Sequence, residues 1–128
     1  MTAAAAHFSQ SYAEARNRFL AAATEAGARV NQHLHPLKGP GGETLAMDVA
    51  RLGPKDASRI LGIGSGTHGV EGYCGSGIQT ALLSEGFRQT LPDDTAILFI
   101  HAINPYGFAW NRRVNEDKLS LIHHLPFT

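Results

Sequence analysis

Two β-like runs that enclose a helix constrain this chain more than any other feature of its sequence. Arg59–Gly64 is a short apolar run of the kind expected for a strand buried on both faces. Thr95–Ile103 is the most β-like run in the chain and predicts a central strand. A helix is predicted between them, ending near Thr90. A strand–helix–strand unit of this kind is parallel and right-handed, so we expect an α/β fold with a mixed, partly parallel sheet and flanking helices.

The N-terminal part predicts a helix from about residue 9 to residue 26. Ser11 and Glu14 have the spacing of a capping box, in which their side chains satisfy free backbone donors. Apolar residues recur behind them at helical intervals, and many are alanines, which favours close packing on a sheet. Gly27 is the predicted end of this helix.

A hairpin is predicted next. Apolar residues alternate loosely in residues 28–37 and again in residues 43–52, and the turn-forming sequence Gly-Pro-Gly-Gly lies between them. Two such runs joined by a turn-rich loop indicate two antiparallel strands.

Composition excludes several classes of protein. The chain has 128 residues, of which 43% are hydrophobic and 17% are charged, and this fits one folded domain rather than a disordered chain. Eleven basic residues balance eleven acidic ones, so neither a nucleic-acid interface nor an anionic-membrane patch is expected. The start has no secretory-signal pattern, no apolar run reaches the ~20 residues of a membrane span, and Cys74 is the single cysteine. These features favour a cytoplasmic location.

A glycine-dense loop, Gly64–Gly77, carries the residues best suited to chemistry. His68 and Glu71 lie three positions apart in it, with glycines beside both. Imidazole nitrogen and carboxylate oxygen are both good zinc ligands, and a tight loop lets the two converge on one ion. On spacing alone, an ordinary loop turn is the better interpretation.

The wider context strengthens the metal hypothesis. Asn104–Gly107 (Asn-Pro-Tyr-Gly) follows the second predicted strand, as the loop with His68 follows the first. Ligands of open α/β sheets bind beyond the carboxyl ends of the strands. The two loops are therefore expected to lie together at one edge of the sheet.

The motifs SGTHGVEGYCGSG (residues 65–77) and HAINPYGFAWNRRVNED (residues 101–117) resemble the zinc carboxypeptidase superfamily, and specifically an uncharacterised bacterial branch of it. The resemblance runs from the N-terminal helix to Asp117. It implies that this chain is the N-terminal part of a zinc-carboxypeptidase-like α/β/α sandwich. The implied activity is zinc-assisted hydrolysis of a C-terminal peptide bond or a related amide, with a small peptide or amide as substrate.

The resemblance also implies roles for particular residues. His68 and Glu71 match the first two ligands of a single zinc ion. One of Arg112 and Arg113 matches an arginine that steadies the polarised carbonyl oxygen of the substrate, and Arg113 is slightly favoured. A fixed cation beside developing oxyanion charge is worth several kcal/mol in a dry cleft. The competing interpretation is a pair of solvated loop arginines.

The sequence departs from the family's pattern after Asp117. The expected Asn-Arg pair, a histidine for the third zinc position and a glutamate as general base do not follow. We therefore divide the chain into a zinc-carboxypeptidase-like part, residues 1–117, and a divergent tail, residues 118–128, which reads as frameshifted or prematurely ended. His123 and His124 in this tail are interpreted as incidental. The chain by itself is expected to bind zinc weakly and to lack peptidase activity.

Four alternatives remain open at this stage. Residues 64–69 fit the spacing of a dinucleotide-binding loop, but the acidic residue that this fingerprint requires falls within the predicted helix. Cys74 could act as a nucleophile, although a small buried cysteine is favoured. His101 is interpreted as a core residue rather than a ligand. A non-catalytic, partner-binding fragment is the strongest rival to an enzyme, because an unfinished sheet has an unpaired edge.

Overall fold

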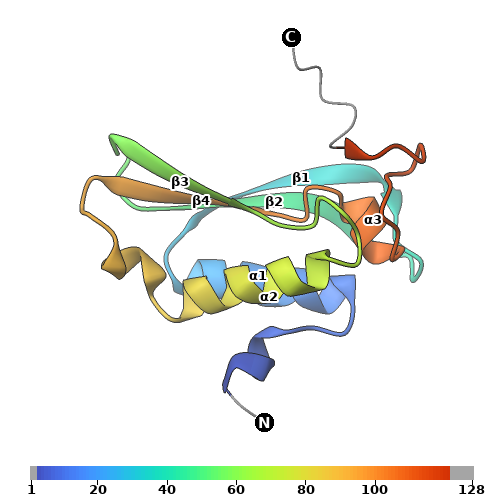
Figure 1. Ribbon diagram of the computed structural model, residues 1–128, viewed down its shortest axis with the longest axis horizontal. Coiled ribbons are helices and arrows are strands. Elements are labelled where there is room, and N and C mark those ends of the chain that lie inside the picture. Colours follow the sequence, from blue (N-terminus) through green and yellow to red (C-terminus); the bar gives the residue numbers. More distant parts are fainter. Residues whose placement is uncertain (1–2, 122–128) are drawn as a thin grey trace.

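A four-stranded mixed sheet forms the centre of the computed structural model, which describes residues 3–121 (Figure 1). Its strands are β1 (Arg29–Lys38), β2 (Thr44–Leu52), β3 (Arg59–Gly64) and β4 (Thr95–His101). They lie in the order β1-β2-β4-β3; β2 is antiparallel to both of its neighbours, and β3 is parallel to β4. The predicted α/β fold with a mixed, partly parallel sheet is confirmed.

Two long helices cover the same face of this sheet (Figure 1). They are α1 (Tyr12–Glu25) and α2 (Gly72–Ser84), and they pack against each other as well as on the strands. Shorter helical segments are η1 (Ala3–His7), η2 (Phe87–Thr90) and α3 (Pro105–Ala109). Within residues 3–121 there is no helix with the length and apolar character needed to cross a bilayer.

The first long helix ends close to its predicted end and begins at Tyr12, three residues after the predicted start near residue 9. The Ser11 hydroxyl accepts a hydrogen bond from the Glu14 amide at 3.1 Å, which is one half of the expected capping box. The Glu14 carboxylate accepts from the Gln10 amide at 2.8 Å and so caps one residue earlier than the motif predicts. Gly27 has φ +78°, a left-handed conformation that favours glycine, and it ends the helix.

The predicted hairpin is also confirmed. β1 pairs with β2 from Arg29↔Arg51 to Lys38↔Thr44, with a bulge between Leu34 and Lys38. The Gly-Pro-Gly-Gly sequence forms the connection, where the Gly39 amide donates to the Glu43 carbonyl at 2.9 Å.

The main core lies between the helices and the central strands. Its buried side chains come from one stripe of α1, from the end of α2 and from β2 and β4, and they include Phe19, Ala23, Leu83, Ile97 and Phe99. The small alanine side chains let α1 approach the sheet closely. Burial of this kind contributes about 25 cal/mol for each Å² of apolar surface removed from water.

The prediction that β3 is buried on both faces is wrong. β3 forms the edge of the sheet, and Ile60 and Leu61 are 60% and 38% exposed. An apolar run without alternation is typical of a buried parallel strand. In the described residues, β3 has a neighbouring strand on one side only, so its composition does not match its exposure.

The glycine-dense loop is shorter than the sequence indicates, because α2 already begins at Gly72. Glycines usually disfavour a helix interior. Here they permit contact, since a Cβ on Gly72 would overlap the Phe108 ring and one on Gly77 would overlap the Phe8 ring. The helix that was predicted to end near Thr90 is divided into two elements. α2 ends at Ser84, and the short helix η2 covers Phe87–Thr90.

Candidate metal centre

The loops that follow β3 and β4 form one structure at the carboxyl edge of the sheet. Ile103 donates a backbone hydrogen bond to the Ser65 carbonyl, and Asn104 donates to the Gly66 carbonyl, each at 2.8 Å. The two loops predicted to meet therefore do meet. Because these bonds join main chain to main chain, they leave the loop side chains available for other contacts.

A short helix fixes the second loop. The Asn104 side chain accepts a hydrogen bond from the Gly107 amide at 2.8 Å and caps α3, while Pro105 occupies its first turn. The Asn-Pro-x-Gly sequence thus ends β4 by starting a helix.

Gly69 brings the His68 loop against the end of this helix. Its amide donates to the Arg112 carbonyl at 2.9 Å. A Cβ at this position would overlap the carbonyl oxygens of Gly107 and Arg112. The approach is therefore possible only for glycine, and it sets the position of the neighbouring His68.

His68 is held by a main-chain contact. Its side chain is nearly buried, with 8% of the residue exposed, and Nδ1 lies 3.3 Å from the Arg113 carbonyl oxygen. A carbonyl oxygen only accepts, so this hydrogen bond requires the proton on Nδ1. In the neutral ring the lone pair then resides on Nε2, a nitrogen through which histidine can bind a metal while Nδ1–H donates to a carbonyl oxygen.

Glu71 occupies the N-cap position of α2, and its side chain makes no capping hydrogen bond. The residue is exposed, and among residues 3–121 its carboxylate has no ion-pair partner. The amino-terminal end of a helix favours negative charge by ~0.3–1 kcal/mol. Within the described residues, the Glu71 carboxylate is therefore an exposed group without an ion pair, three positions after His68 in the sequence.

Arg112 and Arg113 reach this site through their backbone. Their carbonyl oxygens accept from Gly69 and His68, whereas both residues are exposed and neither guanidinium has an ion pair within the described part of the chain. The structure thus brings the arginine pair to the His68 loop. Which of the two side chains faces a substrate stays a prediction.

Within residues 3–121, no group of three or more His, Cys, Asp and Glu residues is positioned to hold a metal ion. His68 and Glu71 therefore belong to no such group in this part of the chain, and their role as zinc ligands stays a prediction. His123 and His124 lie outside the described residues.

Two further interpretations of single residues can be judged directly. His101 is a core residue, as predicted: it is fully buried, and its Nε2 lies 2.8 Å from the Ser76 hydroxyl.

The prediction that Cys74 is buried is wrong, because the residue is exposed. The buried positions of α2 include Gly72, Ser76 and Leu83. Position 74 faces the other way because each helical residue turns the chain by ~100°.

A group of buried polar side chains on α1, β2 and β4 was not predicted from the sequence. Arg16 on α1 donates to both carboxylate oxygens of Asp48 on β2, at 2.8 and 3.1 Å. Asp48 is the register partner of His101, whose ring stacks on Phe19 with centroids 4.5 Å apart. Two features of the sequence could have indicated this ion pair: an aspartate inside an alternating apolar strand and an arginine on an alanine-rich helix. Burial lowers the pKa of His101 to about 3, with Arg16 adding to the effect.

Comparison with known families identifies the chain at the level of sequence. The model of DUF2817, described as a protein family of unknown function, matches residues 8–122. The chain therefore belongs to this family. No curated protein matches it.

Solved structures are similar to the chain at low sequence identity. The glutaminyl cyclase of Tannerella forsythia is 16% identical with a TM-score of 0.50, over 83% of this chain and 44% of that one. A Zn-dependent exopeptidase of Parabacteroides distasonis is 19% identical with a TM-score of 0.44, over 90% and 56% of the two chains. The glutaminyl cyclase of Fimbriiglobus ruber is 12% identical with a TM-score of 0.47, over 67% and 35%. The Tannerella structure supports the fold, and this chain spans less than half of its length.

Proposed function

We propose that this DUF2817 chain supplies the first two ligands of a zinc site, His68 and Glu71, and is the N-terminal part of a zinc-assisted amide hydrolase or acyl-transferring enzyme. The observation that carries the proposal is the state of His68. Its Nδ1 contacts the Arg113 carbonyl at 3.3 Å, which leaves Nε2 of the neutral ring as a lone-pair donor. Glu71 lies three positions further along the same loop, and its carboxylate makes no capping hydrogen bond. Ligands of open α/β sheets bind beyond the carboxyl ends of the strands, and polar side chains without protein partners at this position are typical of a binding site.

The residues present fit part of a zinc site. One imidazole and one carboxylate belong to the ligand sets of catalytic zinc, which usually takes three protein ligands. No third candidate joins them within residues 3–121. Our proposal is therefore that a further ligand comes from outside this part of the chain, and that the chain alone binds zinc weakly. When bound, zinc would polarise a substrate carbonyl and lower the pKa of a water molecule.

The arginine pair is proposed to stabilise charge on the substrate. Arg113 is the stronger candidate, because its own carbonyl contacts the ring of the proposed ligand His68. A guanidinium stays protonated at any working pH and can donate two parallel hydrogen bonds to a developing oxyanion. Its exposed position and the absence of an ion pair in the described residues leave it available for this role.

The proposed substrate is a small peptide or amide. The Tannerella neighbour is named as a glutaminyl cyclase, and a glutaminyl group carries an amide, which supports this class. A second candidate function, a non-catalytic fragment that binds a partner, is favoured by one observation. β3 is an apolar edge strand with Ile60 60% exposed, and such edges readily accept another strand.

Isothermal titration with zinc tests the proposed site. We expect one weak site on the wild-type chain, with a Kd of about 1 μM or higher, equivalent to a binding free energy of about −8 kcal/mol or weaker. His68→Ala and Glu71→Gln should each remove it. His33→Ala is the matched control, because His33 is an exposed histidine on β1, away from the loop.

Two results would contradict the proposal. Zinc binding that is unchanged in both variants would place the metal elsewhere. Tight stoichiometric binding accompanied by turnover of a peptide would show that this chain already holds a complete site.

A further inference from the structure

The two edges of the sheet are built differently. The β1 edge has features that hinder the addition of another strand: Pro36, Lys38 and the bulge between Leu34 and Lys38. The β3 edge reads Arg-Ile-Leu-Gly-Ile-Gly, without a proline and with Arg59 as its single charged residue. Arg59 is already paired with Asp94 of the same chain at 3.2 Å. Within residues 3–121, β3 is therefore the edge that is open to another strand.

The backbone of β3 directs alternate residues away from the sheet. Ser65, directly after the strand, donates its amide to the Ile100 carbonyl of β4 at 2.9 Å. Because backbone groups alternate in direction along a strand, the odd-numbered residues of β3 face β4. The amides and carbonyls that point outward are those of Ile60, Gly62 and Gly64.

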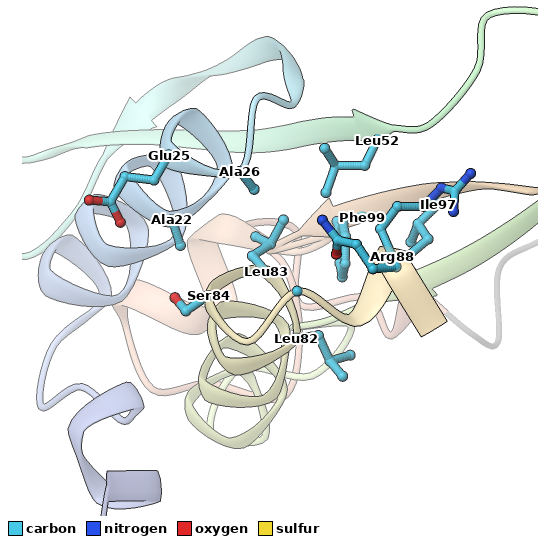
Figure 2. Close-up of a pocket in the computed structure, with 12 residues that line it drawn as sticks. Ala22, Glu25, Ala26, Leu52, Leu82, Leu83, Ser84, Arg88, Ile97 and Phe99 are labelled. Carbon is cyan, nitrogen blue, oxygen red and sulfur yellow. The ribbon is translucent and has the colours of Figure 1, made fainter. Parts of the chain in front are cut away.

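The outer side of α2 continues this edge on the helix-covered face. Gln79 faces the sheet, because its amide donates to main-chain carbonyls of both β3 and β4, at 2.8 and 3.1 Å. Thr80 is buried on the side of α1. Since each helical residue turns the chain by ~100°, Ile78 faces away from α1, and it is 47% exposed. In the close-up of the cavity between α1 and α2, Leu82 also points away from α1 (Figure 2).

We propose that two copies of this chain associate through this flank, with their β3 strands paired antiparallel about a two-fold axis at Gly62. In this register the outward amides and carbonyls of each strand meet those of the other. Ile60, which is 60% exposed, lies opposite Gly64 of the second copy. The side chain beside that glycine is Ile103, so Ile60 would gain an apolar contact there.

The helices fit the same arrangement. The two hydrogen bonds of Gln79 place α2 beneath the gap between β3 and β4. With paired strands about 4.8 Å apart, the axis of α2 would lie about 10 Å from that of its copy, which is a usual distance between packed helices. Ile78 and Leu82 lie on the sides of the two helices that face each other. The apolar surface of β3 and that of α2 would therefore be covered together.

The interface would be small. Specific interfaces bury about 600–1,000 Å² on each partner, and one six-residue strand with one helix from each copy lies at the lower end of this range. We therefore expect a Kd of about 10 μM. The inference does not rest on the proposed zinc site, because His68 lies beyond the carboxyl end of β3. His68→Ala should form the dimer as the wild-type chain does, so the two proposals can fail independently.

Sedimentation equilibrium of the whole chain, over about 1–200 μM, measures this association. Gly62→Pro removes the amide at the centre of the new ladder, on the side that does not bond β4, and Ile60→Lys places a charge on the edge. Each should raise the Kd at least about tenfold. Leu34→Lys is the matched control, because it places the same charge at a 69% exposed leucine of β1, and it should leave the Kd unchanged.

A disulfide tests the register. Opposed residues of a hydrogen-bonded antiparallel pair have Cα atoms about 5.5 Å apart, which a disulfide can bridge. In a Cys74→Ser background, Gly62→Cys should therefore oxidise to a covalent dimer, whereas Leu34→Cys should not.

Three results would overturn the proposal. A chain that stays monomeric up to about 200 μM would leave the β3 edge to a different polypeptide. A dimer that Ile60→Lys does not weaken would lie elsewhere on the surface, and this variant decides even if Gly62→Pro fails to fold, because it leaves the backbone of β3 unaltered. A covalent dimer that forms as readily in Leu34→Cys as in Gly62→Cys would refute the two-fold axis at Gly62.

Discussion

Acid should destabilise this protein through His101. The residue is fully buried, its ring stacks on Phe19, and burial lowers its pKa to about 3 from an ordinary value of 6.5. The folded chain therefore holds a neutral imidazole throughout the range in which the unfolded chain takes up a proton. Since stability rises with pH wherever the unfolded state binds more protons, the contribution is fully present above pH 6.5. It is lost as the pH falls toward 3.

The size of the effect follows from the difference between the two pKa values. Each unit corresponds to about 1.4 kcal/mol. At pH 5 the unfolded imidazole is almost fully protonated and the folded one is not, so linkage gives a loss of roughly 2 kcal/mol relative to pH 7.5. That is a large part of the ~5–15 kcal/mol by which domains are usually stable.

Urea denaturation at pH 7.5 and at pH 5.0 measures this loss. His101→Gln, whose amide can still reach Ser76, should reduce the pH dependence by roughly 2 kcal/mol, whatever its stability at neutral pH. The comparison between variants removes the contribution of the other histidines, including His7 and His35, which pair with carboxylates. An NMR titration of the wild-type imidazoles is a second route. A His101 ring that titrates near pH 6.5 in the folded chain would refute the reasoning.

Two other substitutions test how the site is built. Gly69→Ala should destabilise the chain and weaken zinc binding, because its Cβ would overlap the carbonyl oxygens of Gly107 and Arg112. Gly62→Ala, with open space around it, should change neither the melting temperature nor the zinc Kd appreciably. Tyr12→Phe should cost about 2 kcal/mol in urea denaturation, because the hydroxyl donates to the Ala46 carbonyl and accepts from the Ala46 amide inside the core; a cost below about 0.5 kcal/mol would show that water replaces it.

Much of the fold could be predicted because local chemistry and tertiary packing agree. The Ser11 cap, the helix end at Gly27 and the hairpin connection all depend on residues close together in the sequence. The parallel pairing of β3 with β4 followed from the order of elements, which admits few topologies. The meeting of the His68 and Asn104 loops followed in turn from that pairing.

The errors arose where long-range contacts decide the outcome. The sequence predicts a loop at Gly72 and Gly77, but both lie in α2. Glycine is needed at these helical positions because aromatic rings of distant segments occupy the space that a side chain would fill. The composition of β3 reads as that of a buried strand, although the described residues place a strand on one side of it only. Nor does sequence spacing reveal that Asp48 pairs with Arg16, because the two are 32 residues apart.

The construction of the candidate centre explains why its side chains remain available. The His68 loop is held by main-chain hydrogen bonds from Gly69, Ile103 and Asn104, and by glycines that allow close approach. Had ion pairs fixed the loop, Glu71 and the arginines would have been consumed in holding it. Main-chain attachment instead fixes the backbone without using these charged groups, which is the arrangement that the proposed binding site requires. Of the proposed site residues, which are His68, Glu71 and the two arginines, only His68 has a side-chain hydrogen bond among residues 3–121. That bond uses Nδ1 and leaves Nε2 unoccupied.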